Sequence, residues 1–146
     1  MSIQHRILES FNITLREAAC FGDIEVVRIL LGSIDGIDPS TSRNLAIREA
    51  SRQGYSTIVR LLLETGKVDP TDNNNWAIKW ASANGHVEVV KLLLDYGADP
   101  THDNDWAITN AGTEEIKDLL EAWKYRPDGK EYCRLKSNLA SIGCKN

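Results

Sequence analysis

Three segments of this chain repeat the same order of residue types at nearly constant spacing. In each segment a polar and alanine-rich stretch leads to a glycine, and a run of Ile, Val and Leu follows. The marker glycines, 32 and 31 residues apart, are Gly22, Gly54 and Gly85. An Asp-Pro pair closes each unit, at positions 38–39, 69–70 and 99–100. A period of this length predicts a solenoid, in which every unit buries its apolar face on its neighbours.

A fourth unit starts at Asp105 and is shorter than the others. Its glycine, Gly112, corresponds to Gly85 only if three residues equivalent to 82–84 are missing. A terminal repeat is expected to depart from the common pattern, because one of its sides faces water.

Each unit is predicted to form two helices joined by a glycine turn. The first helices are expected to begin at residues whose side-chain oxygens cap free backbone N–H groups of the same helix. These expected caps are Asn12, Asn44, Asn75 and Asp105. The second helices carry apolar faces too wide for an isolated surface helix, so they must be buried. No segment shows sustained alternation of period two, and the predicted fold is therefore all-α.

The pattern predicts a single domain over residues 1–146. Its four helix-turn-helix repeats are expected at 12–40, 41–70, 71–101 and 102–124. Residues 1–11 are predicted to form a separate amphipathic helix that caps the first repeat. Within 125–146 a second terminal helix is predicted from the spacing of Tyr132, Leu135, Leu139 and Ile142. That helix either caps the stack or projects as a basic amphipathic helix toward a partner or a membrane surface.

Length and residue order exclude several classes of protein. The 146 residues fit one ordinary domain, and the apolar runs are far shorter than the roughly 20 residues of a membrane span. The N-terminus lacks the continuous apolar stretch of a signal peptide, and three widely separated cysteines indicate no disulfide framework. We therefore expect a cytoplasmic protein with reduced thiols and no membrane partner.

The net charge of −4 is unevenly distributed along the chain. Residues 69–121 hold eleven acidic and three basic residues, whereas residues 122–146 hold two acidic and six basic ones. A basic nucleic-acid footprint is absent from the body of the chain, so no nucleic-acid partner is expected.

No combination of residues predicts catalysis, a metal or a cofactor. Serine, histidine, cysteine and acidic residues form no catalytic constellation on a common element, and no glycine-rich loop could hold a phosphate. Asp99, Asp103 and Asp105 have part of the spacing of a calcium loop, but the closing glutamate and central glycine of such a loop are missing. We expect the protein to be no enzyme.

The third unit resembles the ankyrin repeat. Its stretch from Ala81 to Asp99 is similar, almost position by position, to the family pattern A-A-x-x-G-H-x-x-V-V-x-x-L-L-x-x-G-A-D. The resemblance covers about residues 12–121. The family's Thr-Pro-Leu-His opening is replaced by Trp76-Ala77-Ile78-Lys79, and short units of this Asn-x-Ala-Ile type resemble ankyrin repeats abundant in large DNA viruses of amoebae. The resemblance implies protein–protein recognition on a concave surface of hairpin tips and first helices.

Twelve residues are the candidate partner contacts on that surface: Arg48, Arg52, Asp72, Asn73, Asn75, Trp76, Trp80, Asn84, His102, Asp103, Asp105 and Trp106. The tryptophans stand out, because Trp dominates binding hot spots. The alternative is that the three rings pack over the hairpin stems and stabilise the stack. Burial of all three rings would exclude the hot-spot hypothesis.

Charged residues at equivalent positions allow two interpretations. Arg16, Arg48 and Lys79 could form ion pairs between repeats, or they could form a basic stripe that recognises an acidic partner. Of the acidic residues near them, Asp69 and Asp99 are expected to form turns. Asp72, Asp103 and Asp105 are expected to be freer and to favour a basic peptide.

The sequence therefore predicts a non-catalytic module, monomeric without its partner, that binds a protein of unknown identity. A structural or self-associating module is the first alternative. A substrate-recruiting adaptor subunit is the second.

Overall fold

The computed structural model describes residues 2–127, and this part of the chain contains eight helices and no strand. In chain order the helices are α1 (Ile3–Phe21), α2 (Ile24–Ser33), α3 (Thr41–Gln53), α4 (Ser56–Glu64), α5 (Asp72–Ala83), α6 (Val87–Asp95), α7 (His102–Thr109) and α8 (Glu114–Lys124). The predicted all-α fold is confirmed. The helix predicted from Tyr132 to Ile142 lies outside the described residues.

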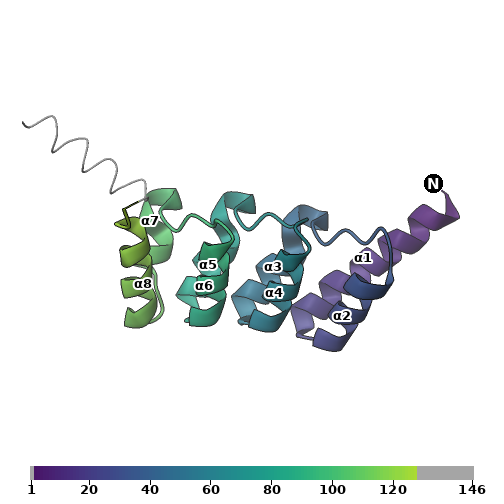
Figure 1. The fold of residues 1–146 in the computed structure, drawn as a ribbon, viewed down its shortest axis with the longest axis horizontal. Coiled ribbons are helices and arrows are strands. Elements are labelled where there is room, and N and C mark those ends of the chain that lie inside the picture. Colours follow the sequence, from purple (N-terminus) through teal and green to yellow (C-terminus); the bar gives the residue numbers. More distant parts are fainter. Residues whose placement is uncertain (1, 128–146) are drawn as a thin grey trace, which may run out of the picture.

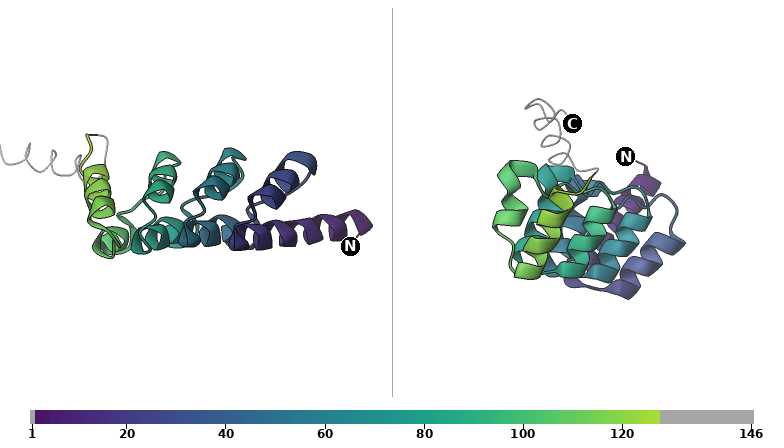
Figure 2. Two further views of the ribbon diagram at one scale, coloured as in Figure 1. Left: turned by 90° about the horizontal axis from the view of Figure 1, so that it is seen from below. Right: turned by 60° about the vertical axis from the view of Figure 1, so that its left-hand side comes forward.

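The helices are arranged as four antiparallel pairs that stand side by side in a row (Figure 1). The first helices of the pairs, α1, α3, α5 and α7, form one layer, and the second helices form the other (Figure 2, left). The core lies between the two layers. Its largest fully buried side chains include Leu15, Ile47, Ile58, Leu62, Ile78, Leu93, Ile116 and Leu120.

Helix α1 is longer than predicted, because the expected capping helix and the first helix of the first repeat form one continuous helix. Ser2 caps it, its side chain accepting a hydrogen bond from the backbone N–H of His5 at 3.2 Å. The separate helix 1–11 and the cap at Asn12 were therefore wrong predictions. No glycine or proline interrupts residues 3–21, and one asparagine costs a helix only a few tenths of a kcal/mol, about 0.7 at most. The start of α1 projects beyond the stack (Figures 1 and 2).

The first turns of α3, α5 and α7 are left-handed. Three consecutive residues in each have φ between 53° and 62°, at 42–44, 73–75 and 103–105. The right-handed helix starts only after them. Seven of these nine residues are Asn or Asp, the types that adopt this conformation at least cost. The polar sequence of the tips is thus what allows the turn to form.

The asparagines predicted as helix caps hold the turns that end their own units instead. The side-chain oxygen of Asn12 accepts a hydrogen bond from the backbone N–H of Asp38 at 2.9 Å, and Asn44 does the same for Asp69 at 2.9 Å. Asn75 repeats the contact in the next unit. Because each side-chain oxygen is occupied by the backbone N–H of such a turn, none caps its own helix. All three asparagines are buried.

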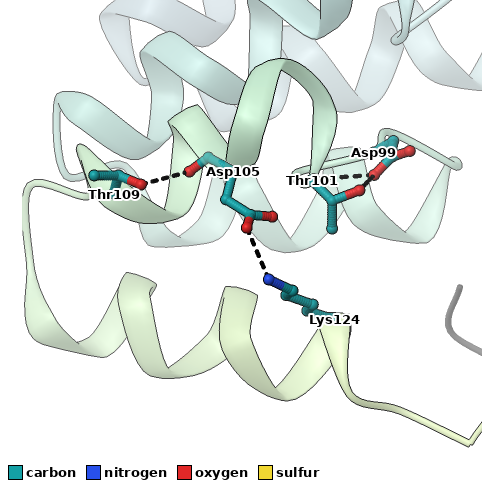
Figure 3. A network of polar contacts seen from close by, with 5 residues as sticks. All are labelled: Asp99, Thr101, Asp105, Thr109 and Lys124. Carbon is teal, nitrogen blue, oxygen red and sulfur yellow. Dashed lines mark hydrogen bonds and ion pairs between the residues drawn. The ribbon is translucent and has the colours of Figure 1, made fainter. Parts of the chain in front are cut away.

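The Asp-Pro pairs form the predicted turns. Asp69 accepts hydrogen bonds from the backbone N–H and the hydroxyl of Thr71 at 2.8 and 2.7 Å. Asp99 binds Thr101 in the same way at 3.0 and 2.6 Å (Figure 3). The turn role predicted for Asp69 and Asp99 is confirmed.

Two glycines allow close contact between units. Gly54 has φ +82° and lies against the His86 ring, and a Cβ there would come within 2.5 Å of Nδ1. Gly112 donates its backbone N–H to the carbonyl of Ser82 at 2.8 Å. The eight-residue α7 is shorter than the twelve-residue α5, as predicted for the fourth unit.

Candidate functional site

Three tryptophans form a row on the first-helix layer. Trp76 and Trp80 belong to α5, Trp106 belongs to α7, and Trp80 lies between the other two. Its ring centroid is 5.7 Å from each neighbour, with interplanar angles of 41° and 51°. Tilted pairs of this kind contribute about 0.5–1.5 kcal/mol each. The rings therefore contact one another across two units, with Trp80 bridging the pair that the sequence placed in equivalent positions.

Exposure distinguishes the members of the tryptophan row. Trp80 is 38% exposed, whereas Trp76 and Trp106 are half-buried. The condition that would have excluded an aromatic hot spot, burial of all three rings, is not met. The guanidinium of Arg48 lies 4.7 Å from the Trp76 ring centroid, at the other end of the row from Trp106. The row thus combines a stacked cation, two partly covered rings and one open ring.

The three acidic residues expected to be free are each held by the chain itself. Asp72 accepts a hydrogen bond from the side-chain amide of Asn44 at 2.8 Å. Asp103 forms an ion pair with Lys79, and Asp105 forms one with Lys124, both at 2.7 Å; Figure 3 shows the second pair. The expectation of free carboxylates was wrong. Lys124 could not be found from repeat spacing, because it lies at the end of α8, outside the repeated tip.

The hydrogen bond from Lys79 lowers the pKa of the Asp103 carboxyl below its ordinary value of 3.8, and the charge of Lys79 adds to the effect. Asp103 is therefore ionised at neutral pH. Its side chain remains 60% exposed, so the pair stays open to solvent on the tip of α7.

The basic residues at equivalent positions reach the next unit by different means. Arg16 donates to the hydroxyl of Ser42, Arg48 stacks on Trp76, and Lys79 pairs with Asp103. Only Lys79 makes the predicted ion pair between units. Glu49 pairs with Arg52 on its own helix at 2.8 Å. The alternative interpretation of the basic residues, a stripe that recognises an acidic partner, stays a prediction.

The remaining candidates divide into surface and interior residues. Asn84 and His102 are exposed, Arg52 and Asn73 are half-buried, and the Asn84 amide donates to the Arg52 carbonyl at 2.8 Å. Asn75 is only 4% exposed. We correct its predicted role, because its side-chain oxygen is used by the turn that ends its own unit and is not presented to a partner.

Sequence reasoning missed an apolar hollow on the same layer, between α1 and α3. Ile13, Phe21 and Leu45 line it together with Cys20. Burial, followed by the charge of Glu49, raises the pKa of the Cys20 thiol above its ordinary value of 9.0. Ile13 and Phe21 are exposed, and the order of residue types in the repeat does not predict this exposure.

Two other features are absent from residues 2–127, a metal-binding cluster and a membrane-spanning helix. Within residues 2–127 no group of three or more His, Cys, Asp or Glu side chains is placed to hold a metal ion. None of the eight described helices is long and apolar enough to cross a membrane.

Stacked helix pairs joined by hydrogen-bonded turns define a helical-repeat protein. More particularly, residues 15–104 match the family model described as ankyrin repeats (3 copies), and the chain therefore belongs to the ankyrin-repeat family. No curated protein matches the chain. Ankyrin repeats generally mediate protein–protein interaction and are typically not enzymes.

Proposed function

We propose that this protein is a non-catalytic module that binds one partner protein on the surface of α1, α3, α5 and α7 and their tips. The observation that carries the proposal is the tryptophan row, with Trp80 open to solvent at its centre. Tryptophan is enriched in binding hot spots because it buries a large area with few rotatable bonds. An exposed ring held between two others loses little freedom when a partner covers it.

The polar contacts around the row support the same proposal. Lys79 in α5 holds Asp103 at the tip of the next unit, and Lys124 fixes Asp105 from α8. Side chains that are already ordered lose less entropy on binding than mobile ones. The surface is thus organised before a partner arrives.

Affinity capture with the full chain, from an extract of the organism that encodes it, tests this function. Trp80→Ala is expected to lose a specific partner that the wild type retains. The matched control is Tyr96→Ala, which removes an exposed aromatic ring from the end of α6 in the second-helix layer. Circular dichroism establishes that both variants fold. Capture of no specific partner, or capture lost only in Tyr96→Ala, would contradict the proposal.

The proposal includes a protein partner, a cytoplasmic location, and no binding to nucleic acid or membranes. The excess of eight negative charges in residues 69–121 supports the absence of binding to nucleic acid and anionic membranes, because this surface would repel phosphate groups. Titration with a DNA duplex and with anionic vesicles is expected to give no binding at physiological salt. Fluorescence microscopy of the tagged chain tests the location.

The start of α1 favours a second candidate function, self-association. Ile3 is 77% and Ile7 is 49% exposed, one turn apart on the projecting part of the helix. Light scattering separates the two candidates, because the recognition module is proposed to be a monomer without its partner. A dimer that Ile3→Lys and Ile7→Lys dissociate would favour self-association.

A further inference from the structure

The cations around Trp80 already have partners in the chain. Arg48 stacks on Trp76, Arg52 pairs with Glu49, and Lys79 and Lys124 pair with the two tip carboxylates. Three of the four are thus paired with a carboxylate of the chain, and the fourth, Arg48, covers the ring at the end of the row and not the open ring of Trp80. The electrostatic environment of Trp80 therefore does not favour an acidic or phosphate-bearing partner.

Hydrogen-bond acceptors, in contrast, are open beside the tryptophan row. Asn84 and Asn110 follow Trp80 and Trp106 by four residues, which places them on the same side of their helices. Their side-chain amides donate to the carbonyls of Arg52 and Trp106 at 2.8 and 2.9 Å. The amide oxygens of both residues receive no hydrogen bond within residues 2–127, and both residues are exposed.

The same two asparagines stand at the C-terminal ends of α5 and α7. The last carbonyls of a helix carry a partial negative charge, which favours a cation nearby. An indole face is also negative at its centre, and cations bind over it. An open ring, two free acceptors and the C-terminus of α5 together complement a cationic group that donates several hydrogen bonds.

Within this chain, tryptophan rings are stacked by arginine. Arg48 lies 4.7 Å from the centroid of Trp76, and Arg126 lies 3.5 Å from that of Trp123. Lys79, by comparison, turns to a carboxylate beside the row. A guanidinium is flat, weakly hydrated and carries five N–H donors, so it can stack and donate in its plane at once.

We propose that Trp80 receives an arginine side chain from an extended segment of the partner protein. The guanidinium lies on the exposed indole and donates to the amide oxygen of Asn84 or Asn110. This inference rests on the proposed function, because it names the chemistry of the partner for the same surface.

Peptide titration of the full chain tests the inference. Three nine-residue glycine-based peptides carry arginine, lysine or citrulline at the same three positions, and two-dimensional NMR follows the tryptophan indole N–H signals. The arginine peptide is expected to bind about fivefold more tightly than the lysine peptide and to shift the Trp80 signal. The citrulline peptide, which keeps the shape without the charge, is expected to bind more weakly than both.

Two variants and a control locate the contact. Trp80→Ala is expected to reduce the arginine affinity to that of lysine, and Asn84→Lys, at an exposed position, is expected to abolish the preference without affecting folding. The control, Tyr96→Ala, is expected to preserve the preference for arginine over lysine. Equal affinity for arginine and lysine, or an arginine preference that survives Trp80→Ala, overturns the inference. The inference is also overturned if a ten-nucleotide oligothymidine, used as a nucleic-acid probe, shifts the Trp80 signal at a lower concentration than the arginine peptide does.

The inference and the proposed function fail in different ways. If Trp80→Ala loses the captured partner but the peptides are not discriminated, only the arginine inference is overturned. If capture does not depend on the first-helix layer, the proposed function fails, and with it the role given to Trp80.

Discussion

The side-chain oxygen of Asn75 accepts a hydrogen bond from the backbone N–H of Asp99 at 2.8 Å, and this contact ties the start of the third repeat to the turn that ends it. The equivalent bonds of Asn12 and Asn44 have lengths of 2.9 Å. Each of the first three units is therefore closed by the same pair of residue types. The stability of the stack is expected to depend on these buried asparagines.

Asn75→Ala is expected to lower the free energy of unfolding by about 2–5 kcal/mol. The backbone N–H of Asp99 would lose its acceptor in a buried place, at a cost of about 1–3 kcal/mol. Alanine would also have to adopt the left-handed conformation of residue 75, where φ is 57°, at a cost of about 1–2 kcal/mol. Urea unfolding followed by circular dichroism measures the loss.

Two further variants at this position separate the two causes. Asn75→Gly keeps the left-handed conformation at little cost but has no acceptor, so we expect a loss of about 1–3 kcal/mol. Asn75→Asp keeps an acceptor, as Asp105 does in the equivalent position of the fourth unit, and is expected to lose least. Equal losses for alanine and aspartate would show that the hydrogen bond is not the cause.

Gly112→Ala is expected to destabilise the fourth unit by about 1–3 kcal/mol. A Cβ at this position would lie 2.4 Å from the carbonyl oxygen of Ala83, which is backbone and cannot move aside easily. Gly32 in α2 is the matched control, because no atom lies within 4 Å of its Cβ position. Gly32→Ala is expected to stabilise the protein by up to about 1 kcal/mol through helix propensity. Thermal melting compares the two variants. The prediction fails if both substitutions shift the melting temperature in the same direction.

Ser82→Ala is expected to raise the free energy of unfolding by about 1 kcal/mol. Ser82 is fully buried, and its hydroxyl has no hydrogen-bond partner among residues 2–127. Alanine removes this unsatisfied group and retains the close packing. Ser40→Ala provides the opposite case, because the Ser40 hydroxyl donates a hydrogen bond to the Asp38 carboxylate at 2.6 Å. Removal of this hydroxyl is expected to destabilise the protein. A lower denaturation midpoint for Ser82→Ala would contradict the prediction.

Lys79→Met is expected to raise the pKa of Asp103 toward its ordinary value of 3.8. In the wild type the hydrogen bond and charge of Lys79 lower this pKa, so the pair contributes its full stability above pH 3.8 and loses it as the pH falls through the lowered value. Carboxyl-detected NMR titration measures the shift. An unchanged midpoint in Lys79→Met would show that the pair does not form in solution. Lys91→Met serves as the control, because Lys91 pairs with Glu115 and not with Asp103.

The repeat pattern predicted the helices well because the signals that end them are local. Gly22 and Gly54 each end a first helix with φ 82°, a conformation that other residues rarely adopt. The length of α1 was missed because the same local reasoning gave Asn12 a capping role. Nothing between residues 3 and 21 forces the chain out of a helix, so Asn12 lies inside one.

The sequence predicted which residues lie in the candidate site better than it predicted which residues they contact. Asn75 binds a backbone N–H 24 residues further along, and Asp105 binds a lysine 19 residues further along. Such partners are set by how the helices and turns of a unit fold back on one another, which a capping rule does not consider. The position of Trp80 between two rings has the same origin, because α5 and α7 must pack before the order of the rings is defined.

The asparagine bonds also determine how a change at one turn spreads along the stack. One buried contact at the same place in successive units fixes the turn that leads from each helix pair into the next, so a small rotation at one turn grows into a large displacement at the far end. Asn75 holds the turn at the junction between its own unit, which carries Trp80, and the unit that carries Trp106. A variant at this junction will alter the spacing of the two rings, and with it the affinity for a partner that touches neither Asn75 nor Asp99.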